Sequence, residues 1–247
     1  MNFTSFRINY TTSKMDIAVS FVGNLKLLKM KKYGHLAILG CLIIASCDTK
    51  KTEIKITITK KELMEAGAKT IENMQTAYKG EKTATAKYEA FSKKAEDEGF
   101  HNIALLYKAV SRAESIHAAN HKVVIEDAGA NVPIIIPDYK VKTTRENLSD
   151  DVKGEAYEAT TMYPNFLKAA ATANNQMAIV SLTYAMKTEV KHNIFFEQAL
   201  KDINSNKQSS LPTKYFVCPA CGDTYATNAP NHCDFSLTER EKFIVFQ

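Results

Sequence analysis

Apolar side chains recur every three or four residues along most of the chain from residue 60 to residue 204. This is the period of an α-helix with one apolar face. Glycine and proline, which interrupt helices, are sparse in the chain as a whole. The pattern predicts four helices, at about residues 60–98, 101–128, 143–173 and 174–204. The predicted fold class is therefore all-α, with Gly99 as the expected C-cap of the first helix.

Two capping boxes support the predicted starts of the first and third helices. Thr59 with Glu62, and Thr143 with Glu146, have the spacing at which each side chain bonds the backbone N–H of the other residue. Pro164 lies within the third helix, where its ring and its missing N–H should kink the helix or mark a local break.

The segment 129–143, between the second and third helices, has a different character. Its run Val132–Pro137 is apolar, but it is too short for a helix and is bounded by prolines. We expect an extended connection that crosses between two helical hairpins, so that the hairpins together form a four-helix bundle.

A weak internal repeat supports two hairpins of one kind. The first copy of each motif recurs 74 or 75 residues later. The pairs are Gly80-Glu81 with Gly154-Glu155, Glu114-x-x-His117 with Glu189-x-x-His192, and Tyr88 with Tyr163. The tyrosine follows the Glu of its own Gly-Glu by seven residues in the first copy and by eight in the second. The repeat predicts a site with approximate twofold symmetry.

The repeated motifs carry candidate metal ligands. In Glu-x-x-His both side chains lie on one helix face, because residues three apart are neighbours there. A bundle that binds two irons or manganeses needs one Glu from each of two helices and a Glu-x-x-His from each of the other two. The chain supplies this inventory in Glu81, Glu114, His117, Glu155, Glu189 and His192, with Glu158 as an additional candidate ligand. One Glu-x-x-His is more typical of a solvated pair, but two copies in apolar surroundings favour ligation, since an uncompensated buried carboxylate is costly.

From Met30 the chain has the organisation of a secretory signal. Two lysines, an apolar stretch at residues 35–45 and small residues precede Cys47. The stretch is shorter than the roughly 20 residues that span a bilayer. A buried helix is the alternative, but the polar run 48–53 follows at once.

Residues 44–47, Ile-Ala-Ser-Cys, resemble a bacterial lipobox. This resemblance implies cleavage before Cys47 and a lipid on its sulfur, on an exported protein anchored in the cell membrane or the outer membrane. The true start would be Met30. The expected organisation is a leader at 1–47, a tether at 48–58, the bundle at 59–207 and a small module at 208–247.

The formal net charge of +5 comes from the N-terminal segment. Residues 1–47 hold six basic residues and one acidic residue, and the rest of the chain has equal numbers of both. A neutral mature protein lacks the basic surface that nucleic acids bind, so we expect no nucleic-acid partner.

The five cysteines do not make an even-numbered disulfide framework. Cys218-Pro-Ala-Cys221-Gly looks like the first knuckle of a rubredoxin, and Cys233 follows. Ser236 stands where that pattern requires the fourth cysteine. Three thiolates with a serine alkoxide, His232 or water would hold iron or zinc more weakly than four thiolates do. The alternative is a decayed knuckle that binds zinc or nothing.

Taken together, these motifs resemble the rubrerythrin family over roughly residues 60–246. The resemblance rests on Gly80-Glu81, Ala95-Glu-Asp-Glu-Gly-Phe100, Ala113-Glu114-x-x-His117, Gly154-Glu155-x-x-Glu158, Met162-Tyr163-Pro164 and Glu189-x-x-His192. It implies a ferritin-like four-helix bundle that holds two irons, with a rubredoxin-like module after it. By this resemblance Glu114 and Glu189 bridge the irons, and Glu81 and Glu155 are terminal ligands.

The resemblance implies further roles. Glu158 would exchange with His117 as one iron changes its redox state, and this extra Glu separates the family from simpler ferritin-like sites. Tyr88 and Tyr163 would hydrogen-bond the carboxylates of ligands. Without the resemblance, these tyrosines are equally well explained as core aromatics at helical spacing.

We therefore expect a lipid-anchored di-iron peroxidase that reduces hydrogen peroxide to water. Electrons would come from a donor that the sequence does not name and would enter through the C-terminal cysteines, in what is expected to be a homodimer. One alternative is a ferritin-like iron storage protein or ferroxidase, against which Glu158 argues. Another is a membrane-tethered metal-binding protein without enzymatic activity, which the missing fourth cysteine favours.

Overall fold

The computed structural model of the protein describes residues 3–11, 14–21, 54–207 and 210–247. The chain divides into two compact units, Met1–Leu63 and Met64–Gln247. The predicted signal and Cys47 lie outside the described residues, so the leader and the lipid anchor stay predictions. Among the residues that are described, no helix combines the length and the apolar character needed to cross a bilayer.

The first unit contains an antiparallel sheet with the strand order β1-β2-β3. Its strands are β1 (Phe3–Thr11), β2 (Lys14–Phe21) and β3 (Ile54–Thr59). β3 overlaps the end of the segment that we expect to be a tether. Its sequence Ile-Lys-Ile-Thr-Ile-Thr alternates apolar and polar residues, which is the period of a strand.

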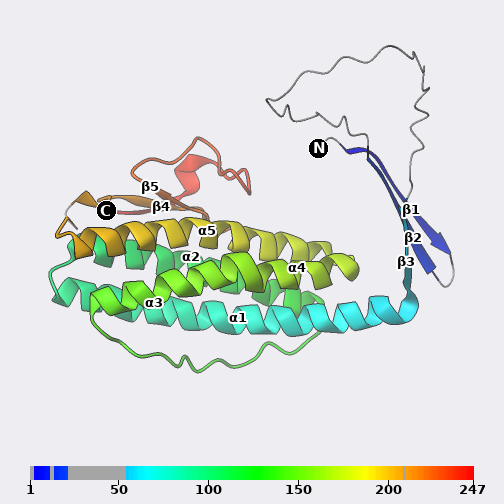
Figure 1. The fold of residues 1–247 in the computed structure, drawn as a ribbon, viewed down its shortest axis with the longest axis horizontal. Helices are drawn as coiled ribbons and strands as arrows, with labels where there is room; N and C mark the ends of the chain where they lie inside the picture. The colour runs from blue at the N-terminus through cyan, green and yellow to red at the C-terminus, as the bar shows by residue number, and fades with distance from the viewer. Residues whose placement is uncertain (1–2, 12–13, 22–53, 208–209) are drawn as a thin grey trace, which may run out of the picture. The chain divides into compact units, whose positions relative to one another are not determined.

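The second unit is the predicted four-helix bundle (Figure 1). Its helical segments are α1 (Lys60–Asp97), α2 (His101–Asp127), α3 (Thr144–Tyr157), the π-helix η1 (Glu158–Met162), α4 (Tyr163–Thr172) and α5 (Gln176–Asn204). The third predicted helix is thus continuous but has a π-helical turn at its middle. Both capping boxes are present, at Thr59 with Glu62 and at Thr143 with Glu146. Gly99 ends α1 with φ +80, as its C-cap role requires.

The π-helical turn explains the unequal spacing of the internal repeat. A π-turn inserts one residue into an α-helix, and such insertions are frequent at functional sites. η1 lies between Glu155 and Tyr163, which are eight residues apart, whereas Glu81 and Tyr88 are seven apart along the regular α1. The extra residue lets Tyr163 reach the position that matches Tyr88. The local break predicted at Pro164 corresponds to this π-helical turn. The turn ends at Met162, and Pro164 lies in the first turn of α4, which follows directly.

The connection from α2 to α3 runs along the bundle without helix or strand, as predicted (Figure 1). Two contacts hold it to α1. Gln75 donates to the Asn131 carbonyl at 2.8 Å, and Tyr139 packs edge-on against Phe91.

The C-terminal module is a small antiparallel sheet with the strand order β5-β4-β6. Its strands are β4 (Tyr215–Val217), β5 (Thr224–Ala226) and β6 (Ile244–Phe246). Tyr215 and Val217 belong to the same buried cluster as Tyr107 of α2 and Phe196 of α5. The module therefore packs directly on the bundle.

Candidate metal centre

Six of the seven predicted ligands meet at the centre of the bundle. Each of the six is at most 3% exposed. Their potential ligand atoms form two groups, each within 4.8 Å: Glu81, Glu114, His117 and Glu189, and Glu114, Glu155, Glu189 and His192. Glu114 and Glu189 belong to both groups. Two adjacent metal positions that share two carboxylates would have this arrangement.

Both histidines turn Nδ1 toward the shared carboxylates. Nδ1 of His117 lies 2.9 Å from Glu114 and 3.0 Å from Glu189. Nδ1 of His192 lies 3.1 Å from Glu114 and 2.7 Å from Glu189. Each imidazole would therefore bind a metal through Nδ1, at the same place as the carboxylate oxygens.

The outer nitrogens of the two histidines face the C-terminal module. The Thr224 hydroxyl donates to the Gly222 carbonyl at 3.0 Å, so it accepts from Nε2–H of His192 at 3.1 Å. This hydrogen bond fixes the tautomer that leaves Nδ1 of His192 free as a ligand. Nε2 of His117 makes no hydrogen bond and lies against Gly222. The two halves of the site are thus held differently.

Two tyrosines orient the carboxylates at the ends of the cluster. The Tyr88 hydroxyl donates to Glu155, and the Tyr163 hydroxyl donates to Glu81. Both tyrosines are at most 2% exposed. These are the partners that the family resemblance implies.

Without a metal, the cluster holds protons. Burial and the charges of Glu114 and Glu189 raise the pKa of Glu81 well above its usual value. Burial alone lowers the pKa of each histidine, but the nearby carboxylates outweigh it. The pKa of His117 is raised to about 10 and that of His192 to about 9. A bound cation would displace these protons, so metal binding is coupled to proton release.

Three buried carboxylate oxygens of the cluster make no hydrogen bond to the described residues. They are Oε1 of Glu114, Oε2 of Glu155 and Oε1 of Glu189. Oε1 of Glu114 and Oε1 of Glu189 each face a histidine Nδ1, at 3.1 and 3.0 Å. Several carboxylates buried this close together are costly, and a pair of cations between them removes that cost. Carboxylates and imidazoles on four helices are also the donor set of di-iron bundles. The residues therefore fit a di-iron centre.

Glu158, the seventh predicted ligand, lies beside this cluster but in neither of the two groups. It is the first residue of the π-helix and is half-buried. Burial and the charges of Glu189 and Glu114 raise its pKa to about 8. Its charge in turn acts on Glu81, so it is close enough to interact with the site electrostatically. Its role as a ligand stays a prediction.

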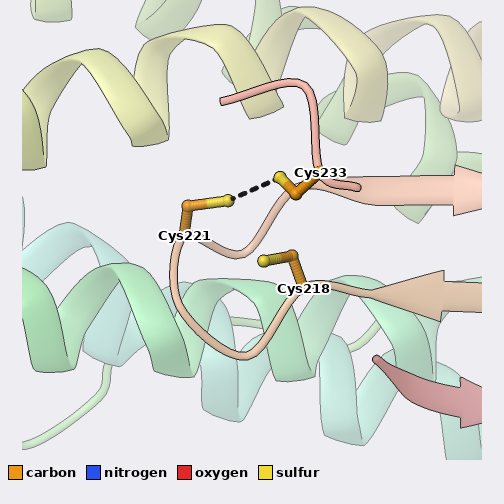
Figure 2. Close-up of side chains that lie close together, drawn as sticks. All are labelled: Cys218, Cys221 and Cys233. Atoms are coloured by element: carbon orange, nitrogen blue, oxygen red, sulfur yellow. Dashed lines mark hydrogen bonds between the residues drawn. The ribbon is translucent and has the colours of Figure 1, made fainter. Parts of the chain in front are cut away.

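The three C-terminal cysteines form a second buried cluster, with their sulfurs turned toward one another (Figure 2). Sγ of Cys221 lies 3.3 Å from Sγ of Cys233, too far for a disulfide bond. Ser236 Oγ lies 3.2 Å from Sγ of Cys218, where a fourth ligand would complete the site. His232, the other candidate, is exposed. The geometry places the serine, rather than the histidine, beside the thiols.

Lys191 and Asp223 connect the cysteine cluster to α5. Asp223 is fully buried, and it receives a hydrogen bond from Lys191 at 2.5 Å. Sγ of Cys233 lies 3.8 Å from the same carboxylate. Lys191 also lies 4.0 Å from the centre of the Tyr225 ring. This ion pair, in which Asp223 is buried and Lys191 is partly exposed, holds the turn after Cys221 against α5 next to His192.

Replacing Ser236 by cysteine is expected to convert the three-thiol cluster into a four-thiolate site. The Ser236 hydroxyl already lies beside the Cys218 sulfur, so a cysteine sulfur at this position needs little rearrangement. Four thiolates suit iron or zinc in a tetrahedral site. The Ser236→Cys protein should retain metal at the C-terminal module against a chelator at least about 10-fold longer than wild type. Ser236→Ala is the matched control and should lose metal faster than wild type. Equal retention in all three proteins would show that Ser236 is not part of the site.

Sequence reasoning did not identify four polar residues around the two clusters: His121, Ser181, Asp223 and Thr224. His121 follows His117 by one helical turn, a spacing that signals a shared helix face. Burial lowers its pKa to about 3, so the ring is neutral. The other three are visible only once the helices and the module are packed together.

The chain matches the sequence profile of a known family. The rubrerythrin profile matches residues 72–200, which include all seven predicted bundle ligands. Rubrerythrin-2 of Clostridium acetobutylicum is 29% identical over 180 residues, covering 72% of this chain and 97% of that protein. Nigerythrin of Nitratidesulfovibrio vulgaris is 30% identical over 179 residues, covering 72% of this chain and 86% of that protein.

Solved structures of nigerythrin have the same fold. The fully reduced, all-ferrous state superimposes with a TM-score of 0.65 at 29% identity, over 72% of this chain and 86% of that chain. A mixed-valence state gives the same values. The fold of this chain is thus similar, over 72% of its length, to that of a protein solved in an all-ferrous state.

Proposed function

Since the chain belongs to the rubrerythrin family, we propose that it is a di-iron peroxidase that reduces hydrogen peroxide to water. The observation that carries the proposal is the pair of buried ligand groups that share Glu114 and Glu189. Two ferrous ions bound by these residues would supply the two electrons that the reduction of one peroxide needs. The all-ferrous state of nigerythrin supports iron as the metal.

The chain's own residues would prepare this chemistry. Glu81, Glu155 and the two Glu-x-x-His motifs would hold the irons, and burial keeps bulk water out. The Tyr88 and Tyr163 hydroxyls orient the two terminal carboxylates through the hydrogen bonds described above. Ligand groups fixed in this way need little rearrangement during reaction.

We propose that electrons enter through the cysteine module. Cys221 is followed directly by Gly222, whose backbone touches the His117 ring. Thr224 of the same turn bonds His192. Both imidazoles are therefore in contact with the segment that carries two of the thiols, which supports a short route from that cluster to the bundle.

We also propose that the protein is exported and anchored through a lipid on Cys47, and that it forms a homodimer. The lipobox-like residues before Cys47 support the anchor, and the family resemblance supports the dimer. Labelling cells with a radioactive fatty acid would test the anchor, since a Cys47→Ser chain should take up no label.

Peroxide consumption by the reduced, iron-loaded protein tests the proposed activity. We expect turnover by the wild type and at least about 100-fold less by Glu114→Ala, since losing a ligand should cost more than losing a residue that only supports one. Turnover no higher than that of Glu114→Ala would reject the peroxidase. Faster oxidation by oxygen than by peroxide would favour the oxidase or storage protein instead, and zinc alone in both clusters would favour a non-enzymatic metal-binding protein.

A further inference from the structure

A chain of buried hydrogen bonds leads away from one end of the carboxylate cluster. The Tyr163 hydroxyl donates to Glu81 and lies 3.2 Å from Nε2 of His121. Nδ1 of His121 lies 2.7 Å from the Ser181 hydroxyl. His121 and Tyr163 are fully buried and Ser181 is 5% exposed. Three side chains from three helical segments thus form one continuous path.

The hydrogens of this path all point the same way. Because the Tyr163 hydroxyl donates to Glu81, its oxygen accepts from Nε2–H of His121. A neutral imidazole with a proton on Nε2 accepts at Nδ1, so the Ser181 hydroxyl donates to it. Every donor is therefore directed toward Glu81, as inward proton transfer requires.

The outer end of the path reaches a surface pocket. Ser181 lines a pocket of about 340 Å³ between α2 and α5, together with Asn120, Gln176 and Val180. Ser181, the first group of the path, therefore lies in the wall of this pocket.

The internal repeat provides a built-in comparison. The shift of 75 residues that relates the two Glu-x-x-His motifs places Phe196 at the position of His121, and Leu106 at that of Ser181. Both are fully buried and apolar, and Phe196 packs against Tyr88, the counterpart of Tyr163, with ring centres 5.3 Å apart. Both halves have the same kinds of ligand and a matching tyrosine, but among the described residues the polar path is found on the Glu81 side alone.

We propose that Ser181, His121 and Tyr163 form a proton path from the surface pocket to Glu81. The inference rests on the proposed function, because reduction of one peroxide to two waters takes up two protons with the two electrons. In one passage a proton binds the Ser181 oxygen, and the original hydroxyl proton moves to Nδ1 of His121. The Nε2 proton moves to the Tyr163 oxygen, whose own proton moves to Glu81. No electron moves, and the imidazole is left as the Nδ1–H tautomer. It returns to the Nε2–H tautomer, by losing the proton at Nδ1 and gaining one at Nε2, before the next passage.

Histidine NMR of the zinc-loaded protein tests the path without any turnover. With ¹⁵N-labelled histidine, His121 should be found as the Nε2–H tautomer. Its proton should exchange with water at least about 10-fold more slowly in Ser181→Ala. Ser92→Ala is the matched control, since Ser92 is equally buried and bonds a backbone carbonyl away from the path. An Nδ1–H tautomer, or equal exchange in both variants, would overturn the proposal.

Turnover gives the second readout. Ser181→Ala and His121→Phe should keep the wild-type iron content and the absorption spectrum of the oxidised protein. Both should reduce saturating peroxide about 10-fold more slowly, with a larger solvent deuterium isotope effect. Wild-type rates in a fully loaded Ser181→Ala protein would reject the path, even where His121→Phe fails to fold. An inactive, iron-loaded wild type would instead reject the proposed peroxidase, while the NMR result would still decide the path.

Discussion

Replacing Glu189 by glutamine is expected to remove both metal positions at once. Glu189 belongs to both ligand groups, and both histidine Nδ1 atoms lie within 3.0 Å of it. A neutral amide neither balances two cations nor bridges them. Iron content measured by metal analysis should fall below about one-tenth of the wild-type value, with a corresponding loss of peroxide turnover.

Glu155→Gln separates this effect from a general loss of charge. Glu155 belongs to one ligand group only, so its replacement should weaken one metal position and leave the other occupied. Glu126→Gln, at an exposed position of α2, should bind iron like the wild type. If Glu189→Gln kept half of its iron, Glu189 would not be shared between two metals.

Replacing Gly222 by alanine is expected to separate the C-terminal module from the bundle. An added Cβ would lie 2.4 Å from Nε2 of His117, closer than Cβ atoms pack, and 3.1 Å from the Ala113 carbonyl oxygen, tighter than most Cβ contacts. Gly222 also has φ +80, which costs an alanine about 1–2 kcal/mol, and overpacking adds about 1–3 kcal/mol. The free energy of unfolding should fall by the sum of these two costs. The affinity for iron should also fall, because the added methyl group displaces the His117 ring.

Gly99→Ala is the matched control for backbone strain. Gly99 has the same φ of +80, but nothing lies within 4 Å of an added Cβ. Chemical denaturation should therefore show only the smaller, conformational cost in this variant, with iron binding unchanged. An equal loss of stability in both variants would mean that the module does not press on His117.

The ligands were predictable from sequence because their signals are local. Glu114 and His117 lie on one helix face through their spacing alone, and the second copy of the motif argues against a chance match. The caps at Thr59 and Thr143 likewise depend on contacts between residues three apart. The extra residue before Tyr163 was visible as a spacing of eight instead of seven, but its π-helical form was not.

The four helices, the set of carboxylates and histidines, and the three-cysteine motif were thus predictable from the sequence. The folded protein was needed to show which oxygens face which nitrogens, and to reveal the contacts of Thr224 with His192, of Gly222 with His117, and of Ser181 with His121. The difference comes from the range of the forces involved. Helical periodicity and capping act within one or two turns, whereas these contacts join residues 32 and more positions apart. Such pairs meet only when the packing of whole helices and of the C-terminal module brings them together.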